Sequence, residues 1–138
     1  MLVEYTTEML SQKKAYNRKP SLTLRPNGIF YFSKSAINKM EAKQYVDHLL
    51  FTQNDKTKEW YVSIDNQKGL MIRAYNNSNG ASYITSSTLR KYILLSLSDS
   101  IKEVKPSDVF YFDMETLPEY FEKYGGRKFF KIRLRNGI

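Results

Sequence analysis

One pattern of residues occurs twice in this chain, and this duplication constrains the fold more than any other feature. Seven positions are identical in the two copies: Leu22, Arg25, Asn27, Gly28, Tyr31, Ser35 and Lys39 return as Leu70, Arg73, Asn79, Gly80, Tyr83, Ser87 and Lys91. The offset is 48 residues before the Asn-Gly turn and 52 after it, so the second copy carries a four-residue insertion at 75–78. A loop is where such an insertion is tolerated.

Each copy predicts a strand, a turn, a second strand and then a helix opened by serines. Leu22 and Leu24 alternate with polar residues, Asn27-Gly28 is a strong turn signal, and an aromatic strand follows. A unit of this kind cannot bury its hydrophobic face alone, so we interpret the copies as two pseudo-symmetric β-β-α units that share a core. The alternative is chance similarity between two segments built from common residues.

The rest of the chain predicts further antiparallel strands and short helices. Expected strands are 22–25, 29–32, 45–52, 59–65, 70–75, 81–85, 109–112 and 127–135, of which the four between 45 and 85 form a meander. Expected helices are 36–43, one capped by Ser86 or Ser87, and a short acidic helix from Thr116 to Gly125. The predicted fold class is α+β, with a curved antiparallel sheet of about six to eight strands and two or three helices. A basic arm, 1–20, precedes a single domain, 21–138.

The composition narrows the classes of partner and compartment. A net charge of +8 favours polyanionic partners such as DNA or RNA, single-stranded nucleic acid among them. The absence of cysteine excludes disulfides, thiolate metal sites and cysteine nucleophiles, and it fits a reducing compartment. No hydrophobic run is long enough to span a bilayer, and Glu4 and Glu8 do not fit a leader segment. We therefore expect a cytoplasmic protein without a membrane partner.

The charges are segregated along the chain. Basic residues dominate the arm and the last sixteen residues, whereas 99–122 holds seven acidic residues against two basic ones. In the final strand, Lys131, Arg133 and Arg135 fall on one face together with Phe129, at a spacing of roughly 6.6–6.8 Å between alternate residues. That spacing resembles the phosphate repeat of an extended nucleic-acid strand, so the cations would bind phosphates. The ring of Phe129 would offer a platform on which a base stacks. The alternative is an edge strand that its charges protect from aggregation.

The two arginines of the repeat, Arg25 and Arg73, point away from the leucines of their strands and are expected to share a surface. Cross-strand salt bridges would explain them almost as well. The predicted nucleic-acid-binding residues are Lys13, Lys14, Arg18, Lys19, Arg25, Arg73, Arg127, Lys128, Phe129, Lys131, Arg133 and Arg135.

Two family resemblances point to the same class of partner. Residues 28–34 and the helix after them resemble the strand-to-helix element of AbrB/MazE-type transition-state regulators, over about twenty residues of each copy. That resemblance implies swapped-hairpin dimers that bind DNA. The chain departs from the family at Ser33 and Thr85, where a proline is usual, and it lacks the glycine-aspartate step after the helix. The order of four strands and a helix over 45–97 equally resembles the unit of Whirly and Pur-type single-strand-binding proteins.

Signals for catalysis are weak. His48 is the only histidine, and a structural role is favoured for it because no second histidine or cysteine completes a metal set. Asp108, Asp113 and Glu115 would have to converge to hold Mg²⁺ for a nuclease, and carboxylates near a helix start are usually caps. We therefore predict no enzyme activity, no cofactor and no metal.

The predicted function is non-catalytic nucleic-acid binding with low sequence specificity. The alternative is a structural or assembly protein, a homo-oligomer or a subunit of a larger complex, that docks its acidic surface against a basic surface of a neighbour. Binding of a polyanion requires the cations to gather on one face. Their neutralisation by the carboxylates of 99–122 would favour assembly instead.

Overall fold

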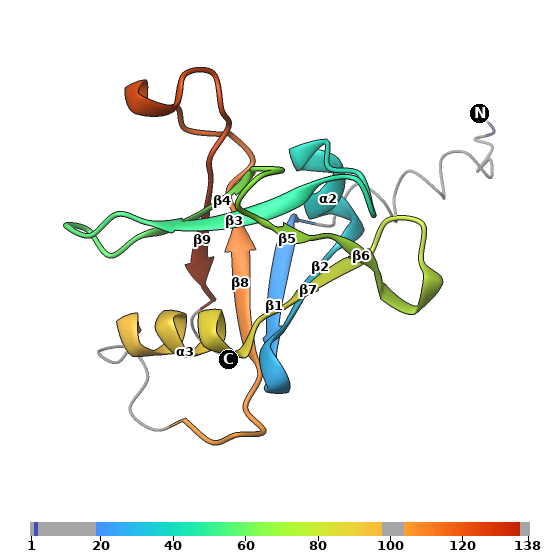
Figure 1. Cartoon of the computed structure of the whole chain (residues 1–138). Helices are drawn as coiled ribbons and strands as arrows, with labels where there is room; N and C mark the ends of the chain where they lie inside the picture. Colours follow the sequence, from blue (N-terminus) through green and yellow to red (C-terminus); the bar gives the residue numbers. More distant parts are fainter. Residues whose placement is uncertain (1, 3–18, 98–103, 136–138) are drawn as a thin grey trace.

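The computed structural model describes residues 2, 19–97 and 104–135 (Figure 1). The described strands are β1 Ser21–Arg25, β2 Ile29–Phe32, β3 His48–Gln53, β4 Trp60–Ile64, β5 Leu70–Met71, β6 Arg73–Ala74, β7 Ser82–Thr85, β8 Phe110–Met114 and β9 Phe130–Leu134. The helices are α2 Lys34–Met40 and α3 Ser87–Ser96, with short 3-10 turns η1 Pro26–Gly28, η2 Tyr75–Asn77 and η3 Glu122–Tyr124.

The strands form one antiparallel sheet that curls into a nearly closed barrel. Its order is β5-β3-β4-β9-β8-β1-β2-β7-β6, nine strands where about six to eight were expected. The two edge strands, β5 and β6, are consecutive in the chain and are separated only by Ile72. The backbone of Ile72 accepts a hydrogen bond from Tyr45 N (2.7 Å) and donates one to Asp47 O (3.1 Å). One segment, 70–74, therefore brings the two edges of the sheet together.

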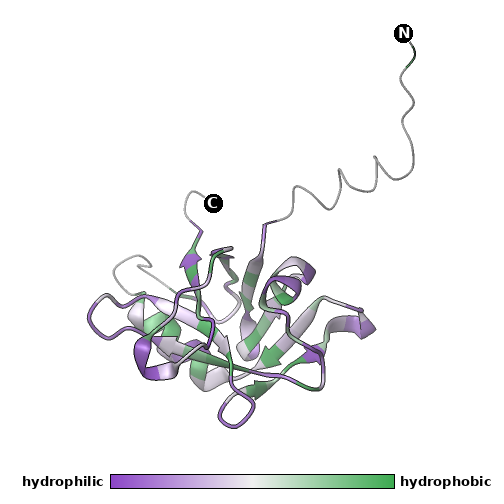
Figure 2. Ribbon diagram, turned by 90° about the horizontal axis from the view of Figure 1, so that it is seen from above, coloured by the Kyte–Doolittle hydropathy of each residue, from purple (hydrophilic) through white to green (hydrophobic). Residues whose placement is uncertain are grey.

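The hydrophobic core fills the barrel. Along β1 and β2, Leu22, Leu24, Phe30 and Phe32 are at most 1% exposed, and the residues between them are only half-buried. This alternation with period two is what a sheet with one buried face requires. In Figure 2 the hydrophilic residues gather in the loops around the periphery of the barrel.

Serine caps begin both helices, as the sequence predicted. Ser33 Oγ accepts a hydrogen bond from Ala36 N, and Ser86 Oγ accepts one from Leu89 N, each at 3.1 Å. These bonds satisfy backbone donors that have no partner inside the helix. Helix α2 begins two residues earlier than expected because Ser33 rather than Ser35 is the cap.

The two Asn-Gly turns lie against the helices of the opposite copies. A Cβ on Gly28, which has a φ of +75°, would lie 2.4 Å from Ser87 N at the start of α3. A Cβ on Gly80 would lie 2.5 Å from Lys34 Cγ at the start of α2. Glycine is needed at Gly28, because its neighbour there is the backbone at the start of α3. At Gly80 the neighbour is a flexible lysine side chain, and the φ of +155° is the second feature that favours glycine.

Two expected elements are wrong. The meander over 45–85 is absent, because β4 pairs with β3 and β9 and not with β5. The acidic helix from Thr116 is also absent. Instead, Glu119 and Phe129 exchange backbone hydrogen bonds of 2.8 and 3.0 Å, so this stretch extends the sheet beside β9. Only the short turn η3 follows, before Gly125.

Candidate nucleic-acid interface

A row of tyrosines crosses the outer face of five adjacent strands. The register places Tyr111 of β8 opposite Thr23, which lies opposite Tyr31, and Tyr31 lies opposite Tyr83. Tyr83 in turn lies opposite Arg73 of β6. Their strand neighbours point into the core, so these side chains point outward. Three aromatic rings and an arginine thus lie in one line across the barrel.

Arg25 and Tyr75 complete this face. The ring centroid of Tyr75 lies 4.9 Å from that of Tyr31 and 6.2 Å from that of Tyr83, both edge to face. The guanidinium carbon of Arg25 lies 4.7 Å from the Tyr31 centroid and 4.9 Å from the Tyr75 centroid, and Arg25 donates a hydrogen bond to the Tyr75 hydroxyl. Cation–π contacts of this kind hold an arginine in place without neutralising it. We call Arg25, Tyr31, Arg73, Tyr75 and Tyr83 the arginine–tyrosine face.

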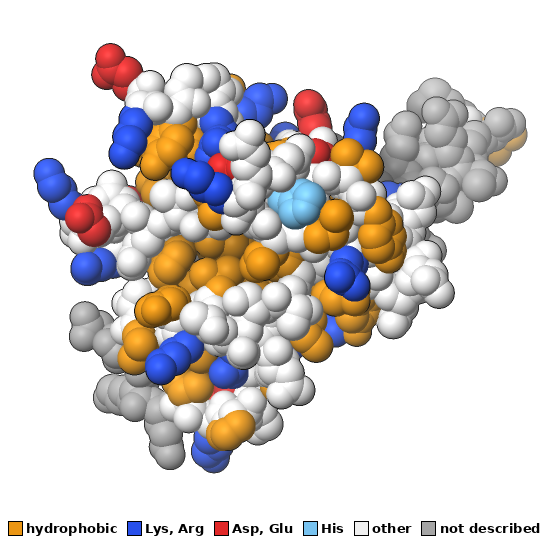
Figure 3. All heavy atoms as spheres, in the orientation of Figure 1, with side chains coloured by type: hydrophobic (Ala, Val, Ile, Leu, Met, Phe, Trp, Pro, Cys, Tyr) orange, Lys and Arg blue, Asp and Glu red, His pale blue; other side chains and the backbone are white. Residues whose placement is uncertain are grey.

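The arginines of this face carry unbalanced positive charge. Among residues 19–97 and 104–135, no carboxylate forms an ion pair with Arg25 or Arg73. Figure 3 shows a basic side chain over β6 and β7 that is surrounded by hydrophobic side chains, while most acidic side chains of that view lie in its upper part. An anion approaching the face meets cations without a carboxylate beside them. The expectation that Arg25 and Arg73 share a surface is consistent with these contacts.

The final strand has a different electrostatic environment. Its ion pairs are Arg127 with Asp65 (3.0 Å), Lys131 with Glu59 (2.8 Å) and Glu119 (3.5 Å), Arg133 with Glu115 (2.7 Å) and Arg135 with Asp113 (2.7 Å). Four cations therefore face five carboxylates, a local balance of −1. We call these paired residues the β9 face. Three of these carboxylates, Asp113, Glu115 and Glu119, lie in 99–122, so the condition that disfavours polyanion binding is met for Lys131, Arg133 and Arg135.

The charge states of the β9 face follow from these contacts. The hydrogen bond from Lys131 lowers the pKa of Glu59, and the same bond raises the pKa of Lys131. The pKa of Asp65 is lowered first by the backbone N–H groups of Gln67 and Lys68, with a smaller contribution from Arg127. These carboxylates are ionised at neutral pH and remain partners of the cations.

Phe129 does not offer a stacking platform, which corrects the sequence-based prediction. Its side chain is 0% exposed, and its ring lies 5.0 Å from Phe121 and 5.2 Å from Tyr124, centroid to centroid. The segment that pairs with Phe129 through Glu119 folds over this side of the strand. The predicted alternation is confirmed on the other side, where Phe130 and Ile132 are buried in the core.

The remaining predicted residues are divided between several places. Lys13, Lys14 and Arg18 of the arm lie outside the described residues, and Lys19 and Lys128 are exposed. Arg135 connects the β9 face to Tyr111, at the end of the tyrosine row: its backbone N donates to Tyr111 O (2.7 Å), and its guanidinium lies 5.8 Å from the Tyr111 ring. Tyrosines were not among the binding residues predicted from the sequence. The available signal was the identity of Tyr31 and Tyr83 in the two copies.

The candidate metal ligands do not gather. Asp113 and Glu115 are held by arginines, and Asp108 accepts a hydrogen bond from Lys105 N (2.7 Å). Within the described ranges, no group of three or more acidic, histidine or cysteine side chains is placed to hold a metal ion. His48 is half-buried in β3, and its Nδ1 has no hydrogen-bond partner in this part of the chain.

Comparisons of the chain with protein-family models, with curated proteins and with solved structures find no significant match. None of the helices in the described ranges is long and apolar enough to cross a membrane. The function is therefore inferred from the geometry of the two faces.

Proposed function

We propose that this protein binds single-stranded nucleic acid without catalysis and with low sequence specificity, through the arginine–tyrosine face. The observation that carries the proposal is the Tyr31–Tyr83 pair, with Arg25 and Arg73 on either side and no carboxylate paired with either arginine in the described residues. Arginines bind phosphates, and tyrosine rings stack on bases whatever their identity. Such a face gives affinity with little sequence preference.

A single strand suits this face better than a duplex. Bases of a duplex stack on each other and offer only their edges, whereas unstacked bases present ring faces to aromatic side chains. Four of its five residues lie on strands, Tyr75 begins the turn η2, and the rings pack against each other. The tyrosines are therefore held in position before a ligand arrives, which reduces the entropy lost on binding.

The β9 face contributes less to this function. Its exposed ion pairs, such as Arg133 with Glu115, are individually weak, so a phosphate could compete for the arginine. The carboxylates remain nearby, however, and repel the same phosphate. We place Lys128, the β9 cations and the basic arm in a supporting role, in which they add attraction at long range.

Neutralisation of the cations by 99–122 was expected from the sequence to favour assembly, but the same ion pairs also occupy the acidic residues that assembly would use. The assembly alternative required acidic residues of 99–122 to pair with basic residues of a neighbouring molecule. Asp113, Glu115 and Glu119 instead pair with β9 of their own chain. The pairs remove unbalanced acidic charge from the surface as well as unbalanced basic charge.

We also propose that the barrel is a duplication of a ββαββ unit larger than the repeat visible in the sequence. The two halves are 21–64 and 70–134. β2 and β7, the strands before the helices of the two halves, pair antiparallel, with Tyr31 directly opposite Tyr83, its equivalent in the repeat. β4 and β9, the last strands of the two halves, also pair antiparallel, with Tyr61 opposite Lys131.

The hairpins of the two halves alternate around the barrel. The hairpin β1–β2 lies between β8 and β7 of the second half, and β3–β4 lies between β5 and β9. This interleaving supports the swapped-hairpin arrangement that the sequence resemblance implies. Fragments 1–67 and 68–138 should each remain unfolded alone and fold when mixed, as followed by circular dichroism. Folding of either fragment as a monomer would contradict the interleaved arrangement, whereas folding as a homodimer would agree with the duplication.

Fluorescence anisotropy tests the proposed function directly. A labelled single strand of about 20 nucleotides should bind with an affinity that falls as salt rises, and a duplex of the same length should bind more weakly. Sedimentation of the free protein at increasing concentration tests the assembly alternative. Absence of strand binding at low salt, together with self-association, would reject the proposal in favour of assembly.

A further inference from the structure

The two copies of the repeat differ at their first strand. β1 is continuous, and its Thr23 lies opposite both Tyr31 of β2 and Tyr111 of β8. The corresponding segment of the second copy is split at Ile72 into β5, which pairs with β3, and β6, which pairs with β7. β5 therefore diverges from β7, and the outer surface opens between them.

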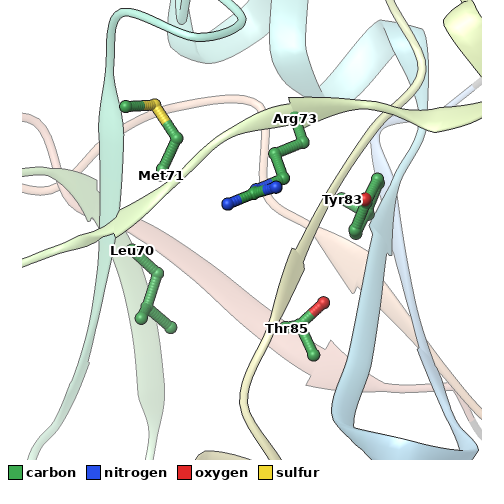
Figure 4. Close-up of a pocket in the computed structure, with 5 residues that line it drawn as sticks. All are labelled: Leu70, Met71, Arg73, Tyr83 and Thr85. Carbon is green, nitrogen blue, oxygen red and sulfur yellow. The ribbon is translucent and has the colours of Figure 1, made fainter.

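This opening is a pocket of about 360 Å³, lined by Leu70, Met71, Arg73, Tyr83 and Thr85, and we call it the seam pocket. Figure 4 shows the guanidinium of Arg73 projecting into the space between the strands, with Leu70 on one side and Tyr83 and Thr85 on the other. Leu70 is 37% exposed there, whereas the matching Leu22 of the first copy is 1% exposed. The split of the strand thus creates the pocket in the second copy.

The two repeat arginines differ accordingly. Arg25 is held between the rings of Tyr31 and Tyr75. Arg73 is exposed, and in the described residues it has no ion-pair partner. A guanidinium that projects into a pocket and lacks a carboxylate is suited to bind an anion with two parallel hydrogen bonds.

We propose that the seam pocket binds one nucleotide of the bound strand, with the phosphate on Arg73 and the hydroxyl of Thr85 and the base against Leu70 and Tyr83. The inference rests on the proposed function and names the subsite where one phosphate and one base are held. A cation and a hydroxyl beside aliphatic and aromatic surface match the two parts of a nucleotide. The volume lies near the lower end of the range for small-molecule pockets, about 300–1,000 Å³.

The pocket makes the face asymmetric. The Tyr31–Tyr83 pair is symmetric under exchange of the two copies, whereas the pocket occurs at the seam of the second copy. A strand with one nucleotide in the pocket therefore has a fixed direction across the tyrosines. The complex should contain one strand per protein molecule, bound with one polarity.

Adenosine 5′-monophosphate and adenosine are the probes for this proposal, with binding followed by amide chemical shifts in NMR titrations of the full chain. The monophosphate should bind the wild type and shift resonances of 70–73 and 83–85, and adenosine should bind at least 10-fold more weakly. Arg73→Gln should weaken binding of the monophosphate about 10-fold or more. The control variant Lys56→Gln, which removes one positive charge from an exposed position in the loop between β3 and β4, should leave it within about 2-fold.

The outcomes separate the two proposals. Equal loss in Arg73→Gln and Lys56→Gln, or shifts outside the pocket, would overturn the nucleotide subsite. The same holds if an oligonucleotide binds the wild type but the monophosphate does not. If no oligonucleotide binds, the proposed function fails instead. Thr85→Val provides a second variant, with an expected loss of several-fold, in case Arg73→Gln perturbs β6.

Discussion

The arginine–tyrosine face and the β9 face both present arginines on the outside of the same barrel, but their neighbours differ. On the β9 face, four cations are matched by five carboxylates. On the arginine–tyrosine face, Arg25 is packed against Tyr31 and Tyr75, and Arg73 opens into a pocket. The strand with the most basic residues is thus not the surface with the most available positive charge.

The sheet order explains this difference. β9 lies between β4 and β8, and Asp113 of β8 lies directly opposite Arg133. Glu59 precedes β4, and Glu115 follows β8. Opposite charges across adjacent strands stabilise a sheet, so these charges serve the fold. β2 and β7, by contrast, place tyrosines opposite each other, and the arginines beside them have aromatic neighbours.

Removal of the tyrosine pair should have the largest effect on binding. Tyr31→Leu and Tyr83→Leu keep most of the packing area but remove the rings, and stacking contributes about 1–3 kcal/mol per base, or about 5- to 150-fold in affinity. Affinity for a labelled single strand, measured by fluorescence anisotropy, should fall by that factor for each base that stacks. Phe at both positions should retain binding.

Tyr92→Leu is the matched control, because Tyr92 lies on α3 and is 60% exposed. Its affinity should equal that of the wild type. An equal loss in Tyr92→Leu and in the tyrosine-pair variant would mean that aromatic surface acts nonspecifically, and the distinction between the two faces would disappear.

Neutralising the two repeat arginines should have the next largest effect. Each phosphate contact to a single strand contributes about 0.7 to the salt slope, so the Arg25→Gln/Arg73→Gln variant should lose on the order of 10-fold in affinity at about 0.15 M salt. Its slope of log K against log salt should be smaller by about 1.4. Titrations at several salt concentrations give both values.

The comparison variant Arg133→Gln/Arg135→Gln changes the net charge by the same amount. Because these arginines are already paired with Glu115 and Asp113, its affinity and salt slope should change much less. If the two double variants lose affinity equally, net charge rather than the arrangement of charges determines binding. The β9 face would then be a binding surface, as the sequence predicted.

Removing a carboxylate from the β9 face should strengthen binding. Glu115→Gln leaves Arg133 without its partner, and one additional phosphate contact is expected to raise affinity about 4-fold at about 0.15 M salt. Glu122→Gln removes the same charge from an exposed position in η3 and serves as the control. A larger gain in Glu122→Gln would show that Arg133 takes no part in binding.

The sequence predicted local structure better than it predicted the site. Alternation in β1 and β2 and the serine caps depend on neighbouring residues, and these predictions are confirmed. The barrel depends on pairing between residues far apart, such as Tyr61 with Lys131, for which one sequence gives no signal. The acidic helix was predicted from local propensity, but backbone pairing of Glu119 with Phe129 takes its place.

The site shows the same limit. Arg25 and Arg73 could be selected from the repeat, and so could Tyr31 and Tyr83, but only the register of β2 and β7 shows that the two tyrosines lie opposite each other. The neutralisation of β9 likewise depends on strands that are distant in the chain. The burial of Phe129 follows from the segment folded over it, which alternation along one strand does not reveal.

The smallest effect concerns the stability provided by the Lys131–Glu59 pair. The pKa of Glu59 is lowered in the folded state, so its contribution to stability is complete above the ordinary pKa of the carboxyl and is lost as the pH falls through the lowered value. The pKa of Lys131 is raised, so its contribution is complete below the ordinary lysine pKa and is lost as the pH rises through the raised value.

Glu59→Gln should therefore lower the free energy of unfolding by less than about 1 kcal/mol at neutral pH, since the pair is partly exposed. The difference from the wild type should stay constant near neutrality and shrink toward acid pH, as measured by urea denaturation. The affinity for a single strand should rise by no more than one additional phosphate contact would give, because Lys131 still has Glu119 as a partner at 3.5 Å. A large gain in affinity would show that Lys131 binds the strand when Glu59 does not pair with it. The two faces would then differ only in the ion pairs that occupy the cations of the β9 face.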